Sequence, residues 1–344
     1  MLSVRPAAPD SESAVTRLKA DMQAARAALR ARFRETGDSA AVLREHRQLV
    51  DRVLKHMWRE LRMPASLALL AVGGFGRGEL YPHSDVDVLV LLPEAPSPAL
   101  TGQIETLIGR LWDTGLELGH SVRTVLECMD EAIKDITVMT SLLESRKLAG
   151  NSSLFADFER ARNATLDRQA FFKAKRLEQE QRHTKFQDSP YSLEPNLKDA
   201  PGGLRDLQVI LWISRACALG NSWPELARRA LITPQEANQA LRHHRLLQDL
   251  RVRLHYAAGR REDRLLFDYQ ESLAADLGYR GTDHRRAGEQ LMQAYFRTAK
   301  AVTQLNVILL QNVGAEIFPV SNSDLEVINE RFRRVGELLD ARST

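Results

Sequence analysis

The chain has 344 residues, of which 44% are hydrophobic and 27% charged, as in ordinary soluble globular proteins. Its 48 Lys and Arg nearly balance its 45 Asp and Glu, and a formal charge of +3 does not favour a nucleic-acid partner. No apolar run reaches transmembrane length, the first residues lack the apolar core of a signal peptide, and the two cysteines form no disulfide or zinc pattern. We therefore expect about two or three domains in a cytoplasmic protein that does not contact the membrane.

The first 150 residues predict a small domain of helices and strands. Helical spacing of apolar residues predicts helices over residues 12–35, 40–62, 99–115 and 128–143. Apolar runs or alternation predict strands at 67–72, 86–92 and 116–126, and a glycine-rich turn at 73–78 follows the first of them. The segment 143–150 is compatible with a helix end or with a short strand closed by Gly150.

The remainder of the chain shows no further strand pattern. Helices are predicted over residues 152–187, 204–219, 224–230, 234–258, 268–277 and 283–313. A loop rich in Pro and Gly spans 188–203, and the tail 314–344 ends in another amphipathic stretch. We predict an α+β fold whose parts are an N-terminal tail and helix (1–38), a mixed domain (39–150), a helical domain (151–320) and a C-terminal segment (321–344).

The strongest candidate site lies at the start of the strand 86–92. Asp85 and Asp87 are two residues apart, so both project from one face of the strand, close to Gly73 and Gly74, whose backbone amides can approach a ligand. This arrangement suits a divalent metal that bridges to phosphate oxygens. A turn-forming role explains Asp85. It does not explain Asp87, because a charge within an apolar strand is costly to bury unpaired.

Gly-Gly followed by Asp-x-Asp resembles the nucleotidyltransferase superfamily of polymerase-beta type. Three longer strings, at residues 71–87, 118–124 (Leu-Gly-His-Ser-Val-Arg-Thr) and 194–208, resemble one branch of it. That branch is the bifunctional uridylyltransferase/uridylyl-removing enzymes that modify the PII signalling protein. The resemblance covers the chain from about residue 40 to residue 320. It implies a polymerase-beta-like domain, with a mixed sheet and flanking helices, followed by an all-helical domain.

The resemblance implies Mg²⁺-dependent transfer of uridylyl from UTP to a tyrosine hydroxyl of PII, with release of pyrophosphate. The residues it implies are the catalytic metal ligands Asp85 and Asp87 and the nucleotide-binding residues Gly73, Gly74, Arg77 and Ser84. Because tyrosine has a high pKa, a base or a metal must assist its deprotonation.

The third carboxylate of the superfamily is not evident. It usually lies on a neighbouring strand, where Ser121 occupies the expected place in this chain. Glu117 and Glu144 are the candidates, although each is also explained as a solvated or ion-paired residue. The remaining alternative is that two carboxylates suffice.

The loop before the predicted helix at 204 carries a cluster of polar residues, namely Asn196, Lys198, Gly203, Arg205 and Asp206. They are compatible with a loop that closes on the transferase cleft and binds nucleotide or PII. They are equally compatible with a loop that docks the two domains and shapes the helix start. The basic residues within 242–264 favour a solvated helix face over a triphosphate site.

Two other functions stay open from the sequence: a non-catalytic nucleotide-binding or regulatory module, and adenylyl rather than uridylyl transfer. The family's uridylyl-removing domain carries a His-Asp pair, and this chain contains no His-Asp dipeptide. We therefore expect the transferase half alone, without the later metal-dependent and regulatory domains, and hence without hydrolytic removal or glutamine control.

Overall fold

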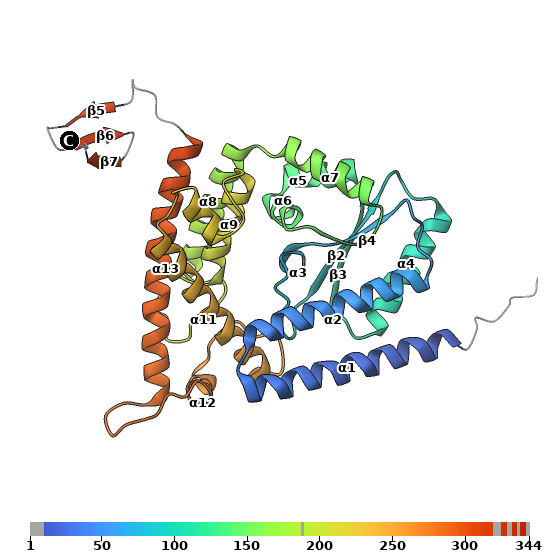
Figure 1. Ribbon diagram of the computed structural model, residues 1–344, viewed down its shortest axis with the longest axis horizontal. Helices are drawn as coiled ribbons and strands as arrows, with labels where there is room; N and C mark the ends of the chain where they lie inside the picture. Colours follow the sequence, from blue (N-terminus) through green and yellow to red (C-terminus); the bar gives the residue numbers. More distant parts are fainter. Residues whose placement is uncertain (1–9, 187–188, 319–324, 329–331, 336–337, 342–344) are drawn as a thin grey trace, which may run out of the picture.

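The computed structural model describes residues 10–186, 189–318, 325–328, 332–335 and 338–341 (Figure 1). The elements of the first part are α1 (Asp10–Thr36), α2 (Ser39–Glu60), β1 (Ala68–Ala71), α3 (Gly73–Arg77), β2 (Val86–Leu92), α4 (Pro98–Asp113), β3 (Leu118–Thr124), α5 (Val125–Lys134), α6 (Ile136–Leu143) and β4 (Arg146–Gly150). Those that follow are α7 (Ser152–Thr165), α8 (Arg168–Lys185), α9 (Leu204–Ala216), α10 (Trp223–Arg228), α11 (Pro234–Ala258), α12 (Phe267–Asp276), α13 (Ala287–Ile317), β5 (Leu325–Val327), β6 (Phe332–Val335) and β7 (Leu338–Ala341). None of the described helices is long and apolar enough to cross a membrane.

A mixed four-stranded sheet lies at the centre of the first part, in the order β3-β2-β1-β4. β1 is antiparallel to β2 and to β4, whereas β2 and β3 run parallel. Successive side chains of β2 alternate between the two faces, and six of its seven residues are buried. The predicted α+β fold, with a mixed sheet followed by helices, is confirmed.

Each face of the sheet is covered by helices and has its own hydrophobic core. Val88 and Val90 share a core with residues of α1, α2 and α4, which lie along one face (Figure 1). Leu70 and Leu89, on the other face, belong to a core that also contains Phe158 of α7 and residues of α8 and α9. Full burial of one such side chain stabilises the fold by roughly 1.5–3 kcal/mol. This second core therefore joins the later helices to the face from which Asp87 projects.

Several local predictions are corrected. The turn at 73–78 is the short helix α3, which ends at Gly78 in the left-handed conformation. The single helices predicted at 128–143 and 152–187 are each two helices, divided at Asp135 and at Asp167. Both aspartates accept hydrogen bonds from backbone N–H groups of the following helix, as N-cap residues do. The segment 143–150 contains strand β4, the second of the two alternatives.

The prediction for the C-terminal tail is wrong. Instead of an amphipathic stretch without strands, β5, β6 and β7 form a three-stranded antiparallel sheet. Each strand has only three or four residues. Over so short a run, the period of a strand is not distinguishable from helical spacing.

The loop before α9 is a loop as predicted, and it packs closely on α13. Gly202 has a φ of +77°, and a Cβ at this position would lie 2.3 Å from the carbonyl oxygen of Ala299. Only glycine fits, because a side chain would be strained and would also collide with the α13 backbone.

We predict that Gly202→Ala lowers the free energy of unfolding by about 2 kcal/mol or more, through strain and overlap. Chemical denaturation measures this change. The control is Gly109→Ala in α4, where a Cβ would meet nothing within 4 Å. That substitution should be neutral or raise stability by up to about 1 kcal/mol. Equal stability of the two variants would contradict the prediction.

Candidate active site

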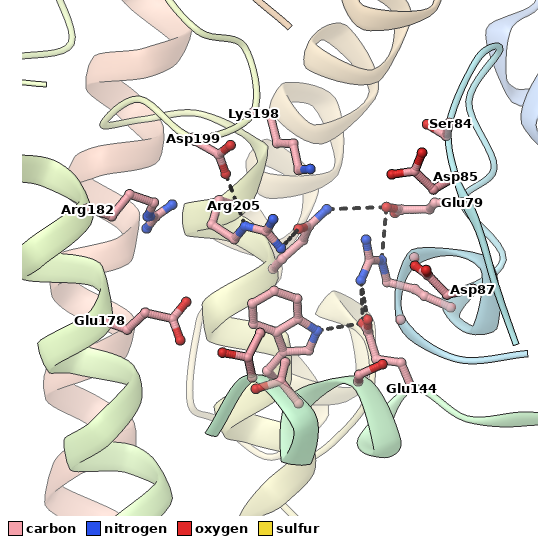
Figure 2. Close-up of a pocket in the computed structure, with 18 of the residues that line it drawn as sticks. Glu79, Ser84, Asp85, Asp87, Glu144, Glu178, Arg182, Lys198, Asp199 and Arg205 are labelled. Atoms are coloured by element: carbon pink, nitrogen blue, oxygen red, sulfur yellow. Dashed lines mark hydrogen bonds and ion pairs between the residues drawn. The ribbon is translucent and has the colours of Figure 1, made fainter. Parts of the chain in front are cut away.

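A cleft of about 710 Å³ lies between the start of β2 and the later helices (Figure 2). From the first part of the chain it is lined by the predicted residues Gly73, Gly74, Arg77, Ser84, Asp85, Asp87 and Glu144. From the second part it is lined by Lys198 and Arg205 among the predicted residues. The other predicted residues, Glu117, Asn196, Gly203 and Asp206, do not line it.

Asp87 is held in β2 between two glycines. Its Oδ2 lies 3.6 Å from the position that a Cβ on Gly73 would take, and its Oδ1 lies 2.4 Å from that position on Gly119. Gly73 has a φ of +56°, which side chains rarely adopt. Burial raises the pKa of Asp87, as does the charge of Asp85. Oδ1 thus packs against Gly119, Oδ2 faces Gly73, and no basic side chain of the described residues pairs with the carboxylate.

Asp85 lies just before β2 and is exposed. It forms an ion pair with Arg261, which follows α11. The sequence interpretation placed Arg261 among residues of a solvated helix face, and the structure corrects this for Arg261. Both side chains are nearly half exposed, so the pair stabilises the fold by about 1 kcal/mol at most. A divalent cation can therefore displace Arg261 from Asp85 at a small cost in free energy.

The two aspartates fit a divalent cation. They are hard oxygen donors, one is half-buried without a counterion, and their mutual repulsion raises the pKa of Asp87. Among the described residues, no group of three or more His, Cys, Asp or Glu is arranged to hold a metal. The other ligands of a bound Mg²⁺ would then be phosphate oxygens and water molecules, because Mg²⁺ commonly keeps several of its waters.

Arg77 and Glu144 form a largely buried ion pair in the cleft. The guanidinium of Arg77 donates to both oxygens of Glu144 and, through Nε, to Glu79 at 2.9 Å (Figure 2). Burial lowers the pKa of Arg77, but the two carboxylates outweigh burial and raise it. Trp212 also donates its indole N–H to Glu144. Glu144 is thus engaged by two side chains of the protein.

Glu117, the other candidate for a third carboxylate, lines a different cavity, beside Arg26 and His46. Neither Glu117 nor Glu144 joins Asp85 and Asp87 in a three-carboxylate group within the described part of the chain.

Lys198 and Arg205 face Asp85 and Asp87 across the cleft (Figure 2). Lys198 has no ion-pair partner among the described residues. Burial lowers its pKa to about 8, with further lowering by the charges of Arg205 and Arg251. Arg205 donates to Asp199 at 3.2 Å.

The other predicted loop residues shape the loop itself. Asn196 accepts hydrogen bonds from the backbone N–H groups of Lys198 and Asp199. Gly203 is the N-cap of α9. Asp206 is fully buried, accepts from the N–H of Gly202 and pairs with Arg182. The docking interpretation therefore describes these three residues, whereas binding of nucleotide or PII by Lys198 and Arg205 stays a prediction.

The comparisons with known proteins agree with this geometry. A family model described as a nucleotidyltransferase domain matches residues 52–138, and one described as GlnD PII-uridylyltransferase matches residues 170–310. The chain is 53% identical over 321 residues to the bifunctional uridylyltransferase/uridylyl-removing enzyme of Nitrosospira multiformis, covering 92% of this chain and 36% of that relative. The corresponding enzyme of Aromatoleum aromaticum is 56% identical over 304 residues, covering 88% of this chain and 35% of the relative.

The chain corresponds to the N-terminal region of the GlnD uridylyltransferases. The resemblance inferred from the sequence is thereby confirmed. The chain spans about a third of the length of the curated relatives that it matches.

Three residues of the cleft stand out among those that sequence reasoning did not assign to the site: Lys175, Trp212 and Arg261. The indole ring of Trp212 has cations on several sides, with Lys175 Nζ at 4.6 Å and the Arg205 guanidinium at 5.2 Å from its centroid. Each such cation–π contact contributes about 0.5–2 kcal/mol of stabilisation. A signal for Trp212 existed, because residues 205, 208 and 212 have the spacing of one helix face. No local pattern could indicate that Arg261 reaches Asp85.

We predict that Arg261→Gln strengthens Mn²⁺ binding up to about fivefold, because Asp85 loses a competing cation. Electron paramagnetic resonance of free Mn²⁺, without nucleotide, measures the affinity. Arg260→Gln is the matched control, since Arg260 pairs with Glu262 instead. An equal gain in both variants would show that general charge, not the contact with Asp85, sets the affinity.

Proposed function

We propose that this chain transfers uridylyl from UTP to a tyrosine of the PII protein, with Mg²⁺ held by Asp85 and Asp87. The observation that carries the proposal is the juxtaposition of this carboxylate pair with Gly73, Gly74 and Lys198 in one cleft, where Lys198 forms no ion pair with the described residues. The names of the relatives support the nucleotide and the acceptor: they are uridylyltransferases, and the family model describes PII as the protein modified.

In the proposed reaction, the tyrosine Oη forms a bond to the α-phosphorus of UTP. The bond from that phosphorus to the bridging oxygen breaks, pyrophosphate leaves, and the phenolic proton passes to solvent. Bound Mg²⁺ supplies positive charge that stabilises the charge developing on the phosphates.

The protein residues bind and orient the nucleotide. Gly73 and Gly74 let the phosphates approach the backbone, because neither carries a side chain, and Ser84 lies beside Asp85 at the same cleft. Lys198 neutralises phosphate charge from the opposite wall. Arg77 already pairs with two carboxylates, so we assign it a positioning role for α3 rather than a phosphate contact.

Incubation of the chain with purified PII, Mg²⁺ and radiolabelled UTP or ATP tests the proposal. Label on PII from UTP supports it, whereas label from ATP alone means that the chain is an adenylyltransferase. No label from either nucleotide, in conditions where a full-length relative labels PII, would contradict the proposed reaction. A non-catalytic nucleotide-binding module would then be the remaining function.

We predict that the double variant Asp85→Asn, Asp87→Asn loses transfer by about a thousandfold or more, because the metal loses both carboxylates. Initial rates of labelling measure the loss. Asp113→Asn, at an exposed position at the end of α4, should retain the normal rate. Activity that survives the double substitution would show that the metal site is misassigned.

We predict that UTP binding weakens by up to about tenfold as the pH rises from 7 to 9. The pKa of Lys198 is lowered to about 8, so its charge is present below that pH and is lost above it. Calorimetric titration at each pH measures the affinity. Lys198→Arg should remove the decline, and Lys185→Arg, an exposed lysine of the same cleft, should keep it. Identical pH profiles for all three proteins would exclude Lys198 as the cause.

A further inference from the structure

Strand β3 is an unprotected edge of the sheet. In the described part of the chain it pairs only with β2, and none of its seven residues is fully buried. Proteins usually shield such edges with Pro, Lys, bulges or a covering element. β3 contains neither Pro nor Lys, and its pairing with β2 is regular from Val86 to Leu92.

The backbone groups that point outward from β3 can be assigned. The N–H of Val86 in β2 donates to the carbonyl of Glu117. The backbone N–H and C=O groups of odd-numbered β3 residues therefore point toward β2, and those of even-numbered residues point away from it. The carbonyl of Leu118 accepts from the Trp112 indole, and the N–H of Thr124 donates to Glu127. Between these two capped ends, the N–H and C=O groups of His120 and Val122 have no partner among the described residues.

The same strand borders the metal-binding carboxylate. Asp87 and Gly119 are register partners, and the Oδ1 of Asp87 occupies the space that a side chain on Gly119 would need. The other oxygen, Oδ2, faces Gly73 on the nucleotide side. In-line displacement places the attacking and leaving oxygens on opposite sides of the phosphorus. If the nucleotide binds on the Gly73 side of Asp87, the attacking tyrosine oxygen must therefore approach from the β3 side.

We propose that the acceptor segment of PII binds by adding an extended strand to the free edge of β3, with its tyrosine opposite Gly119. This inference rests on the proposed function, because it needs a tyrosine acceptor. Adjacent strands lie about 4.8 Å apart, and Gly119 has no side chain to intervene, so a tyrosine on the added strand reaches over β3 toward Asp87. Backbone bonds to His120 and Val122 would fix its register, as in other cases of strand addition.

The first test removes one outward N–H. Val122→Pro deletes the donor of an edge position without touching the pairing with β2, and proline is tolerated at such positions. Val122→Ala is the matched control, because it loses the side chain but keeps the N–H. We expect Val122→Pro to raise the KM for PII at least about tenfold with an unchanged Kd for UTP, and Val122→Ala to resemble the parent chain. Equal KM values for the two variants would overturn the proposal.

The second test needs neither catalysis nor substitution in this chain. Hydrogen exchange is measured with and without a PII variant whose acceptor tyrosine is replaced by phenylalanine. Slower exchange of the His120 and Val122 amides on adding PII supports strand addition, and protection confined to the later helices refutes it.

The two experiments separate this inference from the proposed function. If the parent chain protects these amides but labels no PII, the docking mode stands and the transfer reaction fails. If it labels PII while Val122→Pro behaves as Val122→Ala, the reaction stands and the docking mode fails.

Discussion

The pairing of one arginine with two carboxylates is the constraint on which the cleft depends. Arg77 joins Glu79 and Glu144, and Glu79 in turn accepts from Gln208 of α9 and Gln248 of α11. A buried ion pair adds little net stability, but removing one partner typically destabilises a protein by about 3–5 kcal/mol. The network therefore fixes the orientation of α3 rather than the stability of the fold. Because α3 begins with Gly73 and Gly74, the same contacts place their backbone at the cleft.

This network also explains why the later helices belong to the site. Lys198 approaches from the loop before α9, Arg205 lies in the first turn of α9, and Trp212 of α9 packs in the core of the sheet face that carries Asp87. The sequence suggested a boundary near residue 150, which stays a prediction. The cleft, however, has walls from both sides of that boundary, so the carboxylates alone do not constitute a nucleotide site.

What the sequence predicted were features encoded by neighbouring residues. The apolar runs of β1 and β2 and the two-residue spacing of Asp85 and Asp87 are local, and the structure shows the strands and brings both aspartates to the cleft. The N-caps Asp135 and Asp167 were equally local but were overlooked within long helical patterns. The pairing of Arg261 with Asp85 joins residues 176 apart, and only the packing of the α11–α12 segment on the β2 end creates it.

The two positions of β3 that share the face of Asp87 and lie nearest to it carry no acidic residue. A side chain at position 119 would overlap the Oδ1 of Asp87, so an acidic residue there would force the Asp87 carboxylate to move. The next same-face position, Ser121, is the register partner of Leu89, which is 1% exposed in an apolar core. Ser121 itself is only partly buried, but an acidic residue there would add a third negative charge beside the two aspartates. Positive charge comes instead from the opposite wall of the cleft. Lys198, which forms no ion pair with any residue that the structure describes, faces the aspartates from that wall.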